Sequence, residues 1–166
     1  MYDVVVLVEQ ELTVPDAERL VELYAGTREQ IRFHLIVPCD DAQAQVQASL
    51  AGTELYGITA ERYSVRADEP TVTAQREAQR AADAHAAAAL ERSVQRLRSL
   101  GRDADGVCTH KRPVDALVDD IKRVHGQEAV VLTRPHVVAE LLHVDWSAQA
   151  RRHLGVPVLH VLEQDH

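Results

Sequence analysis

The chain has 166 residues, of which 46% are hydrophobic, 27% are charged and only 4% are aromatic. This length and composition are typical of a single globular domain, residues 1–166, with a core of mainly Val, Leu, Ile and Ala. The net charge of -8 argues against nucleic acid and anionic membranes as partners, because both usually need a basic surface. The first residues show no cationic leader and no apolar span, so we expect a cytoplasmic protein.

The first part of the chain predicts a β-α-β unit. A β-branched run over residues 4–8 favours a strand that is covered on both faces. Thr13 opens a helix-start pattern, and Gly26 suits the carboxyl cap of that helix. The side chains expected on its buried face are Ala17, Leu20, Leu23 and Tyr24. A second strand is expected over residues 31–37 and ends at Pro38, which cannot donate to a central ladder.

The middle of the chain predicts one long helix. Residues 40–71 have no clear pattern, although a short helix near residues 44–51 is an option. Residues 72–100 are rich in Ala and contain neither Gly nor Pro, which favours a helix that Gly101 ends. An apolar stripe at helical spacing should face the sheet: Ala82, Ala86, Leu90, Val94 and Leu97.

The last part of the chain continues the alternation of strands and helices. Strands are expected at 105–110, 129–133 and 156–162. Pro113 opens a helix that Gly126 closes. The apolar face of this helix consists of Val114, Leu117, Val118, Ile121 and Val124. A further helix, capped by Asp145 or Ser147, should run to about Leu154, with Gly155 at its carboxyl end.

This order of elements, without hairpin signals, predicts an α/β fold with a parallel, doubly wound sheet and right-handed crossovers. In such open sheets the ligand normally lies at the carboxyl ends of the strands, where the connections leave. The segment 128–163 contains two of these strands and the polar connection between them. We therefore expect a binding site, if there is one, in this segment.

Three segments resemble the universal stress protein family: YDVVVLVE near the amino terminus, RPVDALVDDIKRVHGQEAVVLT, and ARRHLGVPVLHVLE near the end. The resemblance covers nearly the whole chain. It implies an open five-stranded parallel sheet of the Rossmann-like, adenine nucleotide alpha hydrolase-like type, and a role in the stress response. It also implies a homodimer formed through the last strand, and many members of the family bind ATP or related nucleotides.

The nucleotide loop of that family is not conserved in form here. Family members that bind nucleotide carry Gly-x2-Gly-x9-Gly-Ser/Thr after the fourth strand, because glycines let backbone amides approach phosphate closely. Without a gap, the three glycine positions fall on Thr133, His136 and Trp146, and the hydroxyl position falls on Ser147. Only Ser147 matches, so we expect ATP binding to be impaired or absent.

Other residues are compatible with the binding of a small ligand. Glu9 matches the acidic family position that contacts the nucleoside, and the adenine-side position falls near Val37. Arg134 and His136, with Ser147 at a helix start, suit phosphate or a carboxylate. The alternative is a solvated loop followed by an ordinary helix cap. These five residues form the candidate ligand site, with AMP or ATP as the nucleotides to consider.

A metal site is a separate option. His136, Glu140 and His143 have i, i+4, i+7 spacing and would share one face of a helix. The alternative is chance, because nine histidines in 166 residues produce such spacings without any metal motif. His110 and the cations Lys111 and Arg112 would lie near the same rim of the sheet.

The two cysteines are expected to be reduced structural thiols. Cys39 would sit at a strand end as a redox thiol, but no resolving cysteine is evident near it in the sequence. No nucleophile elbow, Walker loop or dinucleotide fingerprint occurs. We therefore expect a non-enzymatic regulatory protein without a bound cofactor, which acts through a protein partner or a small anion. A nucleotide- or phosphate-binding sensor and a metal-assisted hydrolase are the alternatives.

Overall fold

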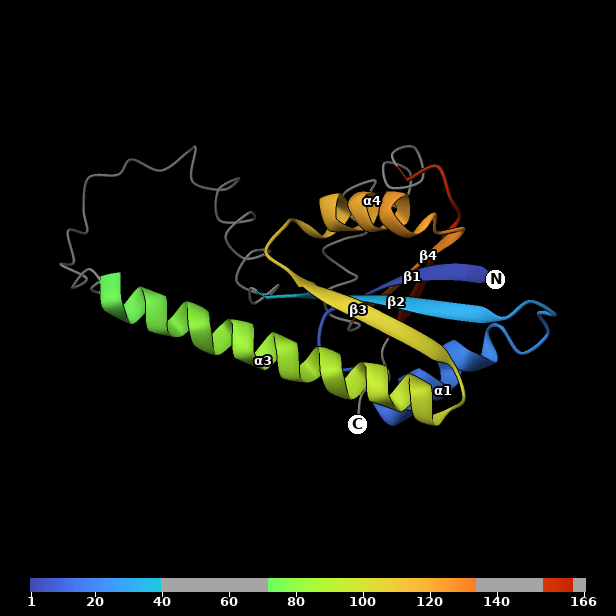
Figure 1. Ribbon diagram of the computed structural model, residues 1–166, viewed down its shortest axis with the longest axis horizontal. Coiled ribbons are helices and arrows are strands. Elements are labelled where there is room, and N and C mark those ends of the chain that lie inside the picture. Colours follow the sequence, from blue (N-terminus) through green and yellow to red (C-terminus); the bar gives the residue numbers. More distant parts are fainter. Residues whose placement is uncertain (40–71, 134–153, 163–166) are drawn as a thin grey trace, which may run out of the picture.

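A five-stranded parallel sheet forms the centre of the molecule (Figure 1). The computed structural model describes residues 1–39, 72–133 and 154–162. The strands, in the spatial order β3-β2-β1-β4-β5, are β1 (Tyr2–Val8), β2 (Ile31–Pro38), β3 (Asp103–Thr109), β4 (Glu128–Thr133) and β5 (Val158–Leu162). Every neighbouring pair is parallel. The predicted α/β fold with a parallel sheet is confirmed.

Helices cover both faces of the sheet. Helices α1 (Val14–Glu22) and α3 (Val72–Ser99) lie on one face, and α4 (Pro113–Val124) lies on the other (Figure 1). Side chains of β1 alternate between the two layers: Val4, Val6 and Val8 pack with the α1 and α3 side, whereas Val5 and Leu7 pack with the α4 side. This alternation explains the unbroken apolar run, because both faces of a central parallel strand are buried.

The start of α1 follows the sequence prediction, but its end does not. Thr13 is the N-cap, and its hydroxyl accepts a hydrogen bond from the Asp16 backbone N–H at 3.3 Å. The helix ends at Glu22 with Leu23 as its C-cap. Leu23 is 45% exposed, so its predicted place on the buried face is wrong, as is the cap at Gly26. The helix ends too early for these positions to continue its buried stripe.

Helix α3 is confirmed with nearly its predicted length of residues 72–100. Ala86, Val94 and Leu97 are buried and Leu90 is partly buried against the same core, as the apolar stripe predicted. Gly101 follows with φ +74°, a conformation that favours glycine. The first turns of α3 extend beyond the carboxyl ends of the strands (Figure 1).

Helix α4 ends differently from the prediction. Its C-cap is His125, which adopts the left-handed conformation with φ 52° and ψ 44°. The Gly126 N–H donates to the Ile121 carbonyl at 2.9 Å, which satisfies a carbonyl of the last turn. Gly126 thus takes part in the helix end, but the left-handed residue is the histidine before it.

The remaining boundaries differ little from the predictions. Strand β3 begins two residues earlier than expected and leaves His110 just outside, while β5 is shorter at its start. The helix predicted from Asp145 or Ser147 lies outside the described residues except for Leu154, which is helical and is followed by Gly155 with φ +66°. The short helix considered near residues 44–51 also lies outside them.

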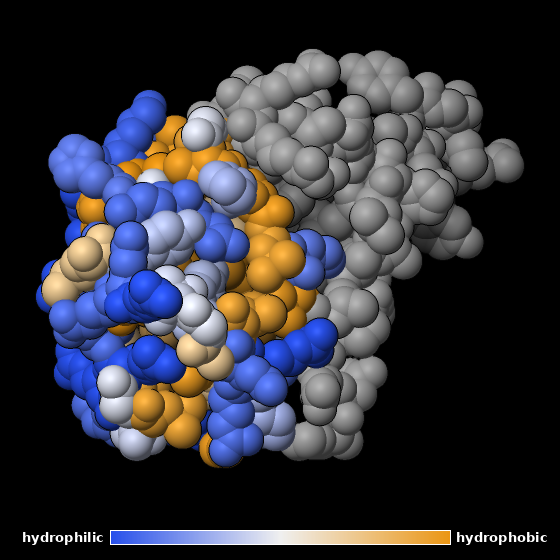
Figure 2. Space-filling model, turned by 90° about the vertical axis from the view of Figure 1, so that its right-hand side faces the viewer, coloured by the Kyte–Doolittle hydropathy of each residue, from blue (hydrophilic) through white to orange (hydrophobic). Residues whose placement is uncertain are grey.

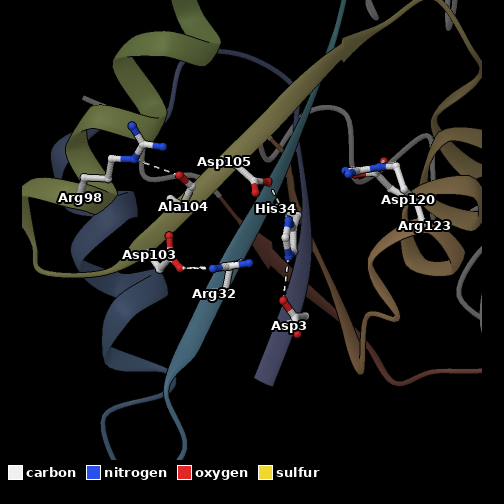
Figure 3. A network of polar contacts seen from close by, with 9 residues as sticks. All are labelled: Asp3, Arg32, His34, Arg98, Asp103, Ala104, Asp105, Asp120 and Arg123. Atoms are coloured by element: carbon white, nitrogen blue, oxygen red, sulfur yellow. Dashed lines mark hydrogen bonds and ion pairs between the residues drawn. The ribbon is translucent and has the colours of Figure 1, made fainter. Parts of the chain in front are cut away.

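A row of polar side chains crosses three strands on the α4 face (Figure 3). His34 of β2 contacts Asp105 of β3 through Nδ1 at 2.6 Å and Asp3 of β1 through Nε2 at 2.8 Å. Next to it, Arg32 forms an ion pair with Asp103 at 2.6 Å. Both ring nitrogens of His34 are thus within hydrogen-bond distance of a carboxylate. This row stitches β1, β2 and β3 together.

The surface is mixed in polarity. Figure 2 shows apolar residues that gather in a band through the described part, with hydrophilic residues on either side. Large apolar side chains with substantial exposure include Val107 on β3 and Leu159 on β5, the two edge strands. None of the helices within the described ranges is long and apolar enough to cross a membrane.

Candidate functional site

The order in which the chain adds strands to the sheet reverses between β1 and β4. The chain passes from β1 to β2 and β3 on one side of the sheet, whereas β4 and β5 lie on the other side of β1. Open α/β sheets bind ligands at the carboxyl ends of the strands where the order reverses in this way. Val8 pairs with Leu132 near these ends, so Glu9 follows β1 next to the end of β4 at Thr133. The end of β4 therefore lies next to the point where the strand order reverses, as the sequence predicted.

The loop between β1 and α1 is held at this edge by α3. The Leu12 N–H donates to the Ser93 hydroxyl at 2.9 Å, and that hydroxyl donates to the Ala89 carbonyl at 2.7 Å. Ser93 is fully buried, and Leu12 is almost so. A buried N–H without a partner is costly, so this side chain fixes the path of the loop.

Glu11 makes a second connection from the same loop to α3. Its carboxylate contacts Arg92 Nε and an Arg96 guanidinium nitrogen, each at 2.5 Å, and Arg96 also donates to the Leu12 carbonyl. Burial alone would raise the pKa of Glu11, but the hydrogen bonds from Arg92 and Arg96 outweigh it and lower the pKa below its ordinary value. The loop next to the candidate site is therefore anchored by charge as well as by Ser93.

Two of the predicted ligand residues are described, and the structure brings them to the same edge. Glu9 follows β1 directly and is partly buried. Val37 lies near the end of the neighbouring β2, and the pairing of Leu7 with Ile36 puts it level with Val8. Val37 is only 2% exposed and belongs to the core on the α1 and α3 side.

The other predicted site residues are not described. Arg134, His136 and Ser147 of the anion site and His136, Glu140 and His143 of the metal option all lie in the segment 134–153, outside the described residues. Both sites stay predictions. The cations expected near the rim are engaged with acidic neighbours, because Lys111 pairs with Asp119 at 2.5 Å and Arg112 pairs with Asp115 at 2.8 Å.

The structure brings together two residues that the sequence did not connect. Cys39 follows β2, and Cys108 lies on β3, where it pairs with Val37. Their side chains are in hydrogen-bond contact, and burial raises the pKa of the Cys108 thiol although this contact opposes the rise. Both cysteines belong to the described part of the chain and do not form a disulfide. Only the β2–β3 register reveals this neighbour of Cys39, since the two residues are far apart in sequence.

Comparison with known proteins places the fold. No protein-family model and no curated protein matches the chain. Among solved structures, a universal stress protein from Archaeoglobus fulgidus is 13% identical, with a TM-score of 0.55 and coverage of 96% of this chain and 93% of that one.

Two further structures contain nucleotides. A universal stress protein family protein from Arabidopsis thaliana with AMP bound is 15% identical, with a TM-score of 0.58 and coverage of 99% of this chain and 93% of that one. A universal stress protein in complex with cAMP is 18% identical, with a TM-score of 0.50 and coverage of 96% and 97%. The resemblance seen in the sequence is thus confirmed at the level of the fold. The chain has the fold of the universal stress proteins.

Proposed function

We propose that this chain is a non-enzymatic regulatory protein of the universal stress protein type, in which the ATP loop has been replaced. It acts in the cytoplasm as a homodimer and signals through contacts with a protein partner. The fold and its similarity to solved universal stress proteins support the class of protein.

One observation carries the loss of ATP binding. Strand β4 ends at Thr133 beside β1, at the position where the sheet order reverses and a phosphate loop would begin. The three glycine positions of the family loop hold Thr133, His136 and Trp146. A side chain at each position takes the space that backbone amides need to approach a phosphate.

The dimer is supported by the position of β5. It is an edge strand of the sheet and carries the exposed Leu159. Proteins usually pair or cover apolar edge strands, because their free backbone groups attract other strands. Light scattering at high micromolar concentration should give the mass of two chains, and a monomer mass would contradict this part of the proposal.

A second function, a sensor of adenine nucleotides or phosphate, has its own support. The similar structures include one with AMP and one with cAMP. Glu9 lies at the edge where a nucleoside hydroxyl would bind, and the loop after it is fixed to α3 by Ser93. Such a sensor would use Glu9, Val37, Arg134, His136 and Ser147.

Calorimetry with ATP, AMP, cAMP and inorganic phosphate separates the two functions. We expect no heat and no change in melting temperature with ATP at millimolar concentration. The variant with Thr133→Gly, His136→Gly and Trp146→Gly should gain ATP affinity. The same variant with Glu9→Gln added is the matched control and should lose part of that gain.

Binding of AMP or cAMP by the natural chain would favour the sensor, and tight binding of ATP would overturn the proposed loss. An assay for phosphate release from ATP tests the absence of catalysis. Turnover above the level of the Glu9→Gln variant would contradict a non-enzymatic role.

A further inference from the structure

Three potential metal ligands meet at the carboxyl ends of β2 and β3, away from the reversal point between β1 and β4. Cys39 follows β2, His110 follows β3, and Asp83 lies on α3. The parallel register places the two strand ends side by side, and the Cys39 N–H donates to the Thr109 carbonyl at 2.8 Å. Three separate elements therefore deliver one side chain each to one place.

The spacing of the three groups suits a small cation. The Cys39 sulfur, one Asp83 oxygen and one His110 nitrogen all lie within 4.8 Å of one another. His110 Nε2 and Asp83 Oδ1 are 3.3 Å apart. Ligands about 2.0–2.3 Å from a tetrahedral zinc ion lie roughly 3.3–3.8 Å from each other. The imidazole and carboxylate already have this separation, and the thiol lies within 4.8 Å of both.

Burial is graded across the cluster. Cys39 is buried, whereas the side chains of Asp83 and His110 are 44% and 54% exposed. An ion thus reaches the carboxylate and the imidazole from solvent, and the thiol forms the inner wall. This arrangement holds a cation on three sides and leaves its outer side open, as in zinc sites that have three protein ligands.

We propose that Cys39, Asp83 and His110 bind a divalent metal ion of the zinc type. The chemistry of the donors sets this class, because a thiolate with an imidazole disfavours magnesium and calcium, which prefer oxygen ligands. A carboxylate completes a ligand set that zinc accepts. The three ligands lie at the ends of β2 and β3 and on α3, and none of them is among the candidate nucleotide residues Glu9, Val37, Arg134, His136 and Ser147.

Cys108 supports the inner ligand without being one of the three. It is in hydrogen-bond contact with Cys39 and packs against the core on the α3 side. Neighbours of this kind orient a metal ligand, and their loss weakens metal affinity. The competing use of this pair is a disulfide between Cys39 and Cys108, which would remove the thiolate that the metal needs.

Cobalt titration of the full chain under reducing conditions tests the site, because cobalt(II) replaces zinc and reports thiolate ligation by a charge-transfer absorption band. We expect one equivalent of cobalt to produce the band and one equivalent of zinc to displace it. Elemental analysis after dialysis against zinc should give one ion per chain.

Single substitutions define the ligands. Cys39→Ser should abolish the band, and Asp83→Asn and His110→Ala should each weaken cobalt binding at least tenfold. His85→Ala is the matched control, because His85 is exposed on the same helix as Asp83 but lies outside the cluster. Asp115→Asn, on α4, is the control for a lost carboxylate. Both controls should bind cobalt like the natural chain.

Several outcomes would overturn the site. Absence of the cobalt band in the natural chain would do so, as would a band lost in Cys108→Ser but kept in Cys39→Ser. Natural affinity in both Asp83→Asn and His110→Ala would also contradict it, and these half-exposed positions should fold even if Cys39→Ser does not. Cobalt binding needs no nucleotide, so failure of the proposed function leaves this test unaffected.

Discussion

Two clusters on neighbouring strands combine a histidine with acidic residues, but they differ in burial and in role. His34 lies between Asp3 and Asp105 near the middle of the sheet, with a side chain only 4% exposed and both ring nitrogens bonded to carboxylates. His110 lies beside Asp83 and Cys39 at the edge of the sheet, with a side chain 54% exposed. One cluster is closed around its histidine, and the other is open to solvent.

The difference shows why residue type alone does not identify a metal site. The imidazole of His34 has no nitrogen left for an ion, since each one already faces a carboxylate at hydrogen-bond distance. The cluster of His110 offers three different donor atoms toward one point and includes a thiol. The first arrangement stabilises the sheet, and the second is suited to a ligand.

The largest expected effect separates the two clusters by stability. His34→Leu should lower the free energy of unfolding by about 3 kcal/mol, because it leaves two carboxylates facing an apolar side chain. His110→Ala is the counterpart at the open cluster and should change that energy by no more than about 0.5 kcal/mol. Urea unfolding measures both. Equal losses would show that the closed and open clusters do not differ in this way.

Zinc should stabilise the natural chain through the open cluster. At free zinc a hundred times its dissociation constant, the natural chain should gain about 2.7 kcal/mol of stability, because the ion binds the folded state. Asp83→Asn should show about half of this gain or less, and His85→Ala should show all of it. Thermal unfolding with zinc and with a chelator gives the values. A full gain in Asp83→Asn would remove Asp83 from the ligand set.

A substitution beneath α3 should disturb the open cluster. A Cβ at Gly106 would lie 2.5 Å from the Leu35 carbonyl oxygen and 2.6 Å from Leu90 Cδ1. Gly106→Ala should therefore cost about 2 kcal/mol and push α3, which carries Asp83, away from β3. Cobalt affinity should fall in parallel. Gly26→Ala is the control, since nothing lies within 4 Å of its added Cβ.

The smallest effect concerns a carboxylate that belongs to neither histidine cluster. The pKa of Glu11 is lowered, so its pairing with Arg92 and Arg96 stabilises the fold above the ordinary pKa of about 4.5, and this contribution is lost as the pH falls through the folded value. Glu11→Gln should cost less than about 1 kcal/mol at pH 7, and this cost should be smaller at pH 4. Melting temperatures at both pH values decide, with the exposed Glu18→Gln as control. A constant difference would show that charge is not the cause.

The sheet and the helices were largely readable from the sequence, because apolar runs and helix-start residues act locally. The run over Val4–Val8, the stripe of α3 and the Pro113 helix start all have the predicted roles. The ends of α1 and α4 were not readable from the glycines. Helix α1 ends at Leu23 in an ordinary helical conformation, and His125 takes the left-handed position that glycine ordinarily suits.

The open cluster was out of reach for a different reason. Cys39, Asp83 and His110 come from three elements, and their meeting depends on the β2–β3 register and on how closely α3 packs at Gly106. No local pattern encodes those distances. The sequence predicted His110 near the rim of the sheet, but it did not predict Cys39 and Asp83 as its neighbours. It also gave no sign that Cys108 lies next to Cys39.

Helix α3 also connects the open cluster to the loop between β1 and α1. Asp83 belongs to the open cluster, and Ser93, ten residues further along the same unbroken helix, holds the loop beside the reversal point. At about 1.5 Å per residue these side chains are roughly 15 Å apart along a stiff rod. The Leu12–Ser93 bond is 2.9 Å long, so a shift of α3 along its axis would change the length and angle of this bond. A displacement of Asp83 along the helix axis would therefore also displace Ser93 and alter the hydrogen bond that holds the loop.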